Sequence, residues 1–262
     1  MNRLNTHFGQ LKNKNEKALI LYITAGDPDM NTTLEIMKSI AANGVDCLEL
    51  GIPFSDPMAD GPVIQRASIR ALENNVNVDL IFSMLKKFRA DYQTPVVLMG
   101  YFNTILRYGM DNFVTAFKKA GGDGLIVADL PWEEGEEFET KCKNQNISLI
   151  YLVSPEIGTE RTQKILSTTG GFVYCVSHYG TTGGATQTED LDGIIESIKS
   201  MTDLPVALGF GISTPQQARK AGELADGIII GSWLIRELEQ TDDKTKVAGQ
   251  FTKKLKRAIV TL

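Results

Sequence analysis

The chain is poor in the residues that build metal sites and disulfide frameworks. Its 262 residues include two histidines, His7 and His178, and three cysteines. No His-x-x-His or Glu-x-x-His pattern occurs, so a catalytic zinc or di-metal site is not expected. The cysteines lie far apart without paired spacing, which argues against a disulfide framework and favours a reducing, cytoplasmic environment.

Long apolar runs and excess basic charge are missing as well. The apolar run at residues 18–23 is too short for a membrane span or for the core of a secretory signal. The formal net charge is -5, which argues against a nucleic-acid or anionic-membrane surface. The basic cluster at residues 253–257 suits the carboxyl end of a last helix.

Two common enzyme motifs are also absent. No nucleophile-elbow sequence supports a Ser-His-Asp triad, and no strand-following G-x-G-x-x-G precedes a helix. The segment Gly209-Phe210-Gly211 resembles part of a dinucleotide motif but lacks its third glycine. The chemistry must therefore come from other side chains.

Apolar, β-rich segments alternate with helical patterns along the whole chain. Eight strands are predicted, at residues 19–24, 45–50, 95–100, 124–128, 148–153, 171–176, 205–209 and 227–231. Helices are predicted at residues 33–42, 63–72, 79–90, 111–120, 134–144, 160–168, 191–200, 215–221 and 233–238, with an amphipathic helix at the end. Strands separated by helices form parallel sheets, and eight such units favour a (β/α)8 TIM barrel with extra helices, as a single domain over residues 1–262.

The second predicted strand carries an acid close to its end. With Val45 and Cys47, Glu49 falls on one face of this strand, and no basic residue lies at a predicted inward position to pair with it. A carboxyl group in apolar surroundings has a raised pKa and can transfer protons near neutrality, so we favour a catalytic Glu49 over a structural one. Asp60, in the loop that follows, could either join Glu49 or cap the helix starting at Pro62.

Glycines mark the ends of the last two predicted strands. The seventh strand ends in Gly209-Phe210-Gly211, and the eighth ends in Gly231-Ser232 before a short helix. Barrels often bind phosphate at this place, although such glycines can also serve tight turns. The long connection after the sixth strand, residues 177–187, is rich in glycine and threonine and is predicted to be a mobile lid.

Residues 48–57, Leu-Glu-Leu-Gly-Ile-Pro-Phe-Ser-Asp-Pro, and residues 59–62, Ala-Asp-Gly-Pro, resemble the signature of the tryptophan synthase alpha subunit family. The resemblance extends from Tyr22 to about Trp233. It implies retro-aldol cleavage of indole-3-glycerol phosphate to indole and glyceraldehyde 3-phosphate, with Glu49 and Asp60 as the catalytic carboxylates and no cofactor in this subunit. The implied substrate-binding residues are Tyr22, Tyr101, Tyr174, Thr182, Gly183, Phe210, Gly211, Gly231 and Ser232.

The resemblance also implies a partner, a beta subunit that carries pyridoxal phosphate in an alpha2beta2 complex. The positions implied to contact it are Pro53, Asp56, Asn103 and Pro131. In the lid, His178, Tyr179 and Gly184 depart from the family pattern. Two alternatives are a stand-alone lyase that releases indole without a partner, and a regulatory subunit that only binds the phosphate ligand.

Overall fold

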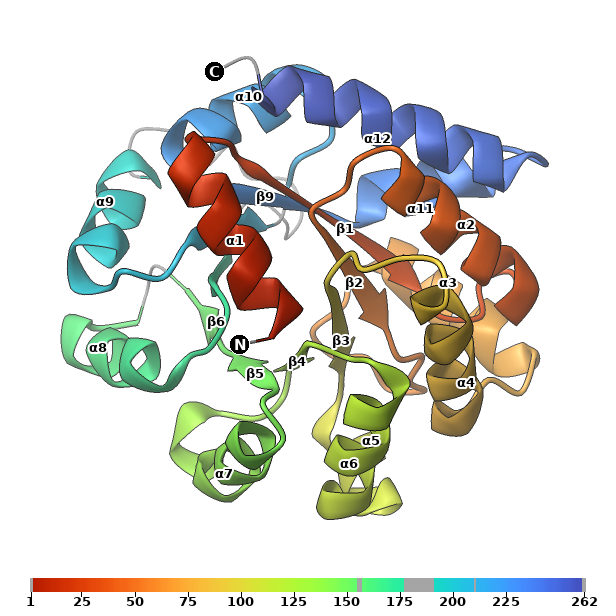
Figure 1. Cartoon of the computed structure of the whole chain (residues 1–262), viewed down its shortest axis with the longest axis horizontal. Coiled ribbons are helices and arrows are strands. Elements are labelled where there is room, and N and C mark those ends of the chain that lie inside the picture. Colours follow the sequence, from red (N-terminus) through yellow and green to blue (C-terminus); the bar gives the residue numbers. More distant parts are fainter. Residues whose placement is uncertain (1, 155–156, 177–190, 210, 261–262) are drawn as a thin grey trace.

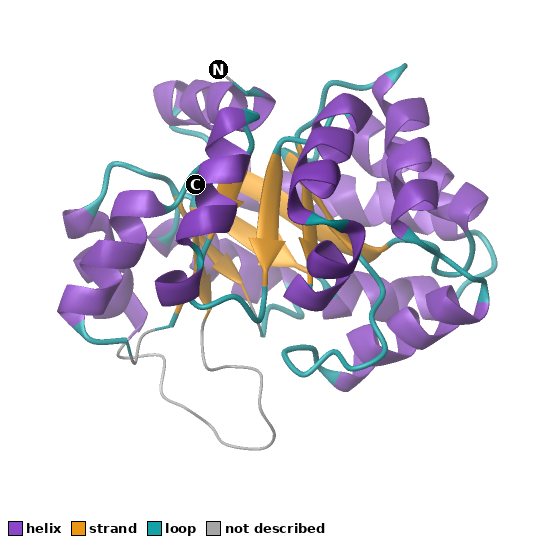
Figure 2. Ribbon diagram, turned by 90° about the horizontal axis from the view of Figure 1, so that it is seen from below, coloured by secondary structure: helices purple, strands orange, loops and turns teal. Residues whose placement is uncertain are grey.

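The strands form one parallel ring. The computed structural model describes residues 2–154, 157–176, 191–209 and 211–260. In this part of the chain the strands follow the order β5-β4-β3-β2-β1-β9-β8-β7-β6, and helices surround them (Figures 1 and 2). The strands are β1 (Ala18–Thr24), β2 (Cys47–Gly51), β3 (Val96–Gly100), β4 (Gly124–Val127), β5 (Ser148–Ile150), β6 (Leu152–Val153), β7 (Val173–Val176), β8 (Val206–Gly209) and β9 (Gly227–Ile230).

The predicted TIM barrel is confirmed, with one strand divided in two. The predicted fifth strand, residues 148–153, is broken at Tyr151 into β5 and β6. These two strands stand at the opposite ends of the pairing order but follow each other along the chain. The ring is therefore nearly closed, and the eight predicted strands correspond to nine in the described residues.

The helices cover the outside of the ring. They are α1 (Arg3–Lys14), α2 (Met30–Ala42), α3 (Pro62–Glu73), α4 (Val78–Arg89), α5 (Phe102–Tyr108), α6 (Met110–Ala120), η1 (Trp132–Glu134), α7 (Glu136–Asn144), α8 (Thr159–Thr168), α9 (Leu191–Met201), α10 (Pro215–Leu224), α11 (Ser232–Glu239) and α12 (Lys244–Val260). Polar side chains cap several amino ends: Asp29 accepts from the backbone N–H groups of Asn31 and Thr32. Pro62 and Pro215 occupy first-turn positions, where the missing N–H costs nothing.

Helix α1 was not predicted, because the N-terminal segment is polar and mixed in charge. It buries Leu4, Phe8 and Leu11, which recur at helical spacing, and Asn2 caps it by accepting from the backbone N–H of Asn5. The helix lies across one end of the barrel (Figure 1). The three side chains join the inner core and close that end of the ring. The short helix α5 was also missed.

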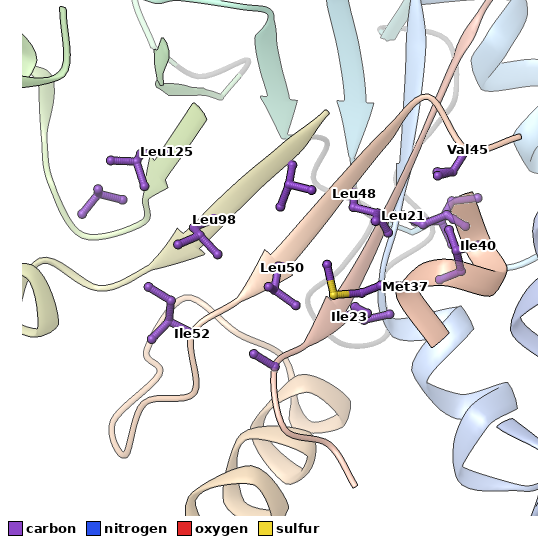
Figure 3. Close-up of a cluster of buried hydrophobic side chains, with 14 of the residues drawn as sticks. Leu21, Ile23, Met37, Ile40, Val45, Leu48, Leu50, Ile52, Leu98 and Leu125 are labelled. Atoms are coloured by element: carbon purple, nitrogen blue, oxygen red, sulfur yellow. The ribbon is translucent and has the colours of Figure 1, made fainter. Parts of the chain in front are cut away.

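Alternation along the strands divides the core into two layers. Leu21, Leu48, Leu50 and Leu98 point outward and pack beneath helices such as α2 (Figure 3). The inner layer contains α1 and the opposite face of the strands: Leu4, Phe8, Leu11, Ala18, Ile20, Cys47, Val97, Ile126, Ile150, Phe172, Tyr174, Ala207 and Ile229. The prediction that Val45 shares a face with Cys47 was wrong, since β2 begins at Cys47 and Val45 packs in the outer layer.

Three aspartates repeat one arrangement at the α1 end of the barrel. Asp46, Asp123 and Asp226 each come directly before a strand, and each carboxylate accepts a backbone N–H at the start of a neighbouring strand. The accepted N–H groups belong to Leu19 at 2.7 Å, Val96 at 2.9 Å and Val206 at 2.9 Å, and the paired basic side chains are Lys256, Arg89 and Lys199. These contacts fix adjacent strands in register.

Candidate active site

Glu49 is buried in the middle of β2. Its position in the sheet lies between Tyr22 of β1 and Val97 of β3. The residue is 1% exposed, and its Oε2 atom has no hydrogen-bond partner in the described part of the chain. Burial, with a smaller contribution from the charge of Asp60, raises the pKa of Glu49 to about 8. No lysine or arginine among the described residues forms an ion pair with it.

Asp60 is held by a tyrosine and does not cap a helix. The residue that caps α3 is Gly61, and no side chain accepts at that helix end. The carboxylate of Asp60 instead accepts a hydrogen bond from the Tyr101 hydroxyl at 3.0 Å. Burial raises the pKa of Asp60, and the Tyr101 hydrogen bond opposes that rise. The capping alternative is therefore wrong.

Tyr101 anchors the whole loop that carries Asp60. Its hydroxyl oxygen accepts the backbone N–H of Ala59 at 3.0 Å while donating to Asp60. Its ring stacks on Phe54, with ring centroids 5.0 Å apart and an interplanar angle of 19°. The backbone N–H of Asp60 donates to the carbonyl of Pro57 at 3.0 Å. Because these contacts fix both ends of the loop, the Asp60 carboxylate has a defined position over the barrel.

Tyr22 and Tyr174 lie inside the barrel close to both carboxylates. Each is 5% exposed, and burial raises the pKa of each phenol well above its usual value. The charges of Glu49 and Asp60 raise both values further. A side chain at Gly51 would collide with the Tyr22 hydroxyl, and one at Gly209 would lie 2.5 Å from the Tyr174 ring. The absence of a side chain at these two glycines therefore leaves space for the rings of Tyr22 and Tyr174.

The glycines predicted to bind phosphate follow β8 and β9. Gly211 has a φ of 77°, which other residues rarely adopt. Gly231 is the capping residue of α11 and offers no side-chain hydrogen bond, so backbone N–H groups at the helix start have no side-chain cap. Ser232 is the first residue of that helix. Of the other predicted positions, Thr182, Gly183 and Phe210 lie outside the described residues, as do His178, Tyr179 and Gly184.

The predicted partner positions follow β2, β3 and β4: Pro53 and Asp56 lie in the loop after β2, Asn103 lies in α5 and Pro131 precedes η1. Asp56, Asn103 and Pro131 are exposed, whereas Pro53 is buried. Met58, in the same loop as Asp56, is 83% exposed and was not predicted. Asp129 accepts the first backbone N–H of α5, from Phe102, at 2.7 Å. This contact ties the loop after β4 to the start of α5.

Three side chains of the inner layer are not among the predicted site residues, which include aromatic but no aliphatic side chains from the strands. Met99, Leu152 and Val176 are partly buried and pack against the inner core. Met99 is paired with Gly51 across the sheet, and Leu152 with Tyr174. Each follows a buried inward residue by two positions, so strand alternation could have found them.

The described residues contain no group of three or more His, Cys, Asp or Glu side chains that could hold a metal ion. In the same part of the chain, no helix is both long and apolar enough to cross a membrane. With its raised pKa, the buried carboxyl group of Glu49 is able to exchange protons near neutral pH.

Comparison with known proteins decides the family. The sequence profile described as "Tryptophan synthase alpha chain" matches residues 8–260. The chain belongs to the tryptophan synthase alpha chain family. The alpha chain of Petrotoga mobilis is 46% identical over 248 residues, covering 93% of this chain and 96% of that protein. The alpha chain of Neisseria meningitidis serogroup B is 45% identical over 246 residues, with coverage of 93% and 94%.

Solved structures agree with the sequence relatives. Tryptophan synthase subunit alpha from Legionella pneumophila has a TM-score of 0.94 and 39% identity, and covers 100% of both chains. A tryptophan synthase structure from Mycobacterium tuberculosis has a TM-score of 0.90 and 31% identity over 100% of both chains. The alpha chain is a lyase of tryptophan biosynthesis that cleaves indole-3-glycerol phosphate, and both the family resemblance and the predicted activity are confirmed.

Proposed function

We propose that Glu49 transfers the protons in this retro-aldol cleavage. The observation that supports its role best is a buried carboxyl group whose Oε2 atom has no hydrogen-bond partner in the described residues. With a pKa of about 8, Glu49 is mostly protonated at neutral pH and can donate its proton to C3 of the indole ring. Protonation at C3 turns the ring into an electron acceptor, so the bond between C3 and the glycerol chain can break.

The same carboxyl group completes the cycle. After donating its proton, Glu49 is a carboxylate in an apolar site and therefore a strong base. It takes the proton from the glycerol hydroxyl next to the breaking bond. That hydroxyl becomes the aldehyde of glyceraldehyde 3-phosphate, the bonding electrons return to the indole ring, and Glu49 is protonated again. The reaction consumes no oxidant, reductant or water.

Asp60 is proposed to stabilise the charge that develops during this step. Protonation at C3 leaves positive charge at the indole nitrogen, and a carboxylate that accepts the indole N–H stabilises it. Tyr101 keeps the Asp60 carboxylate in one position by donating a hydrogen bond at 3.0 Å. Tyr22, Tyr174 and Phe210 are proposed to line the indole pocket.

The phosphate group is proposed to bind between the glycine turns. Gly211, Gly231 and Ser232 would hold it with backbone N–H groups at the start of α11, and Thr182 and Gly183 would contact it from the lid. Anchoring the phosphate fixes the distance from the glycerol chain to Glu49. No cofactor takes part in this subunit.

The partner of an alpha chain of tryptophan synthase is a beta subunit. We propose an alpha2beta2 complex in which the beta subunit carries pyridoxal phosphate, and a cytoplasmic location for it. Docking on the exposed loop with Asp56 and Met58 would bear directly on Asp60, which follows in the same loop. None of the comparisons favours a stand-alone lyase.

The experiment is to titrate beta subunit into the alpha chain and measure indole release. For wild type, the rate should rise and saturate; for Asp56→Ala, saturation should need more beta subunit, because an exposed contact is lost. Asp242→Ala, an exposed aspartate between α11 and α12, serves as the matched control and should titrate like wild type. A rate that does not respond to beta subunit would favour the stand-alone lyase.

A further inference from the structure

One arginine joins three segments around the site. The Arg70 guanidinium binds both carboxylate oxygens of Asp27, with its Nε at 2.7 Å and its Nη2 at 2.8 Å. Its Nη1 donates to Glu239 at 2.8 Å, and Arg66 adds a longer contact to Glu239 at 3.4 Å. Arg70 lies on α3, Asp27 lies in the β1–α2 loop and Glu239 lies on α11. A planar guanidinium with several fixed donors is suited to hold such segments together.

The two helices joined by Arg70 start at different parts of the site. Helix α3 begins at Pro62, two residues after Asp60, and Arg70 lies about 12 Å further along it at 1.5 Å per residue. Helix α11 begins at Ser232, in the proposed phosphate site, and Glu239 is its last residue. The ion pair therefore fixes the distal part of each helix, while the start of each helix faces the substrate.

Apolar packing joins the same helices nearer to the substrate. Val63 and Ala67 of α3 and Ile235 of α11 form a small buried cluster with Tyr22. The side chain of Asn74, the C-cap residue of α3, also donates to the carbonyl of Pro28, in the loop that contains Asp27. With contacts at both ends, α3 and α11 have little freedom to move relative to each other.

We propose that Arg70 is a positioning residue that couples the phosphate site at the start of α11 to the placement of Asp60 before α3. The substrate has a fixed length between its phosphate and its indole ring, so the two sites must keep a fixed separation for productive geometry. The ion pair holds this separation. This inference rests on the phosphate site proposed above.

The variants are Arg70→Met, Arg70→Lys and Glu239→Gln, with Lys141→Met as the control. Lys141 also joins two helices through an ion pair, to Asp111 at 2.9 Å, but on α6 and α7. Lysine at position 70 offers one point charge in place of a fork, so it should restore only part of the effect. Thermal unfolding of each variant measures any loss of stability separately.

The measurement is kcat and KM for indole-3-glycerol phosphate and for indole glycerol without phosphate. For Arg70→Met, kcat with the phosphorylated substrate should fall by roughly three- to thirty-fold, the usual range for residues that couple two sites. Its kcat with indole glycerol should change little, because that substrate does not use α11. In an Asp60→Asn background, the added effect of Arg70→Met should disappear.

The outcomes separate the two proposals. Equal loss with both substrates, or a loss that persists in the Asp60→Asn background, would show that Arg70 acts only on stability and would overturn the coupling. Full kcat for Arg70→Met, in an enzyme that still prefers the phosphorylated substrate, would also overturn it. If wild type cleaved both substrates equally well, the phosphate site itself would be wrong.

Discussion

The stability of Glu49→Gln relative to wild type should increase as pH rises. The same substitution should remove most of the activity. The pKa of Glu49 is raised from 4.5 to about 8 by burial, so the folded state binds a proton that the unfolded state has already lost in this pH range. Between these two values, wild type therefore becomes less stable with increasing pH. Glutamine has nearly the same shape and no charge, so Glu49→Gln lacks this contribution to the pH dependence.

The size of the effect follows from the shift in pKa. Each pKa unit corresponds to about 1.4 kcal/mol. The unfolding free energy of the variant minus that of wild type should therefore be larger at pH 7 than at pH 4 by about 3 kcal/mol. It should approach about 5 kcal/mol above pH 8 and then stay constant. Any loss of packing or hydrogen bonding in the variant adds an offset that does not depend on pH.

Urea unfolding of both proteins from pH 4 to pH 9 tests this expectation. The control is Glu139→Gln, since Glu139 is also buried, at 8% exposure, but pairs with Lys143 on α7. Indole release by Glu49→Gln should fall by at least roughly 10²-fold, the usual loss for one acid–base group. A stability difference that is the same at every pH would refute the raised pKa, and near wild-type turnover would refute the catalytic role.

Three further expectations concern the remaining site and the barrel. Tyr101→Phe removes the hydrogen bond to Asp60, so kcat for indole release should fall by roughly tenfold at unchanged thermal stability; an unchanged kcat would contradict this. Gly211→Val places a branched side chain at a φ of 77°, and KM for the phosphorylated substrate should rise while KM for indole glycerol stays constant. Asp123→Ala leaves Arg89 unpaired and should lower the urea unfolding free energy by about 3–5 kcal/mol, whereas a loss below 1 kcal/mol would contradict the buried pairing.

Patterns within one strand were predictable from the sequence, and contacts between distant segments were harder to predict. Alternation in β2 correctly placed Cys47 and Glu49 inside and Leu48 outside. The role of Asp60 stayed open because a helix cap and a site residue have the same local sequence. The cap is excluded because Gly61 caps α3, and the carboxylate of Asp60 instead contacts Tyr101, 41 residues away. Helix α1 was missed because its overall polarity concealed the apolar spacing of its buried side chains.

Two equally buried acids of the barrel, Asp123 and Glu49, differ in their hydrogen-bond partners. At the α1 end, Asp123 is 1% exposed and accepts hydrogen bonds from Arg89 and from the backbone of Val96, both within 3 Å. In the middle of β2, Glu49 is equally buried, but its Oε2 atom has no partner among the described residues. A pairing with a cation strengthens the fold, whereas an unpaired buried acid such as Glu49 takes up a proton and weakens the fold near neutral pH. The stability that Glu49 removes is the same free energy that raises its pKa, so pairing it with a cation would strengthen the barrel and remove the proton that the proposed mechanism requires.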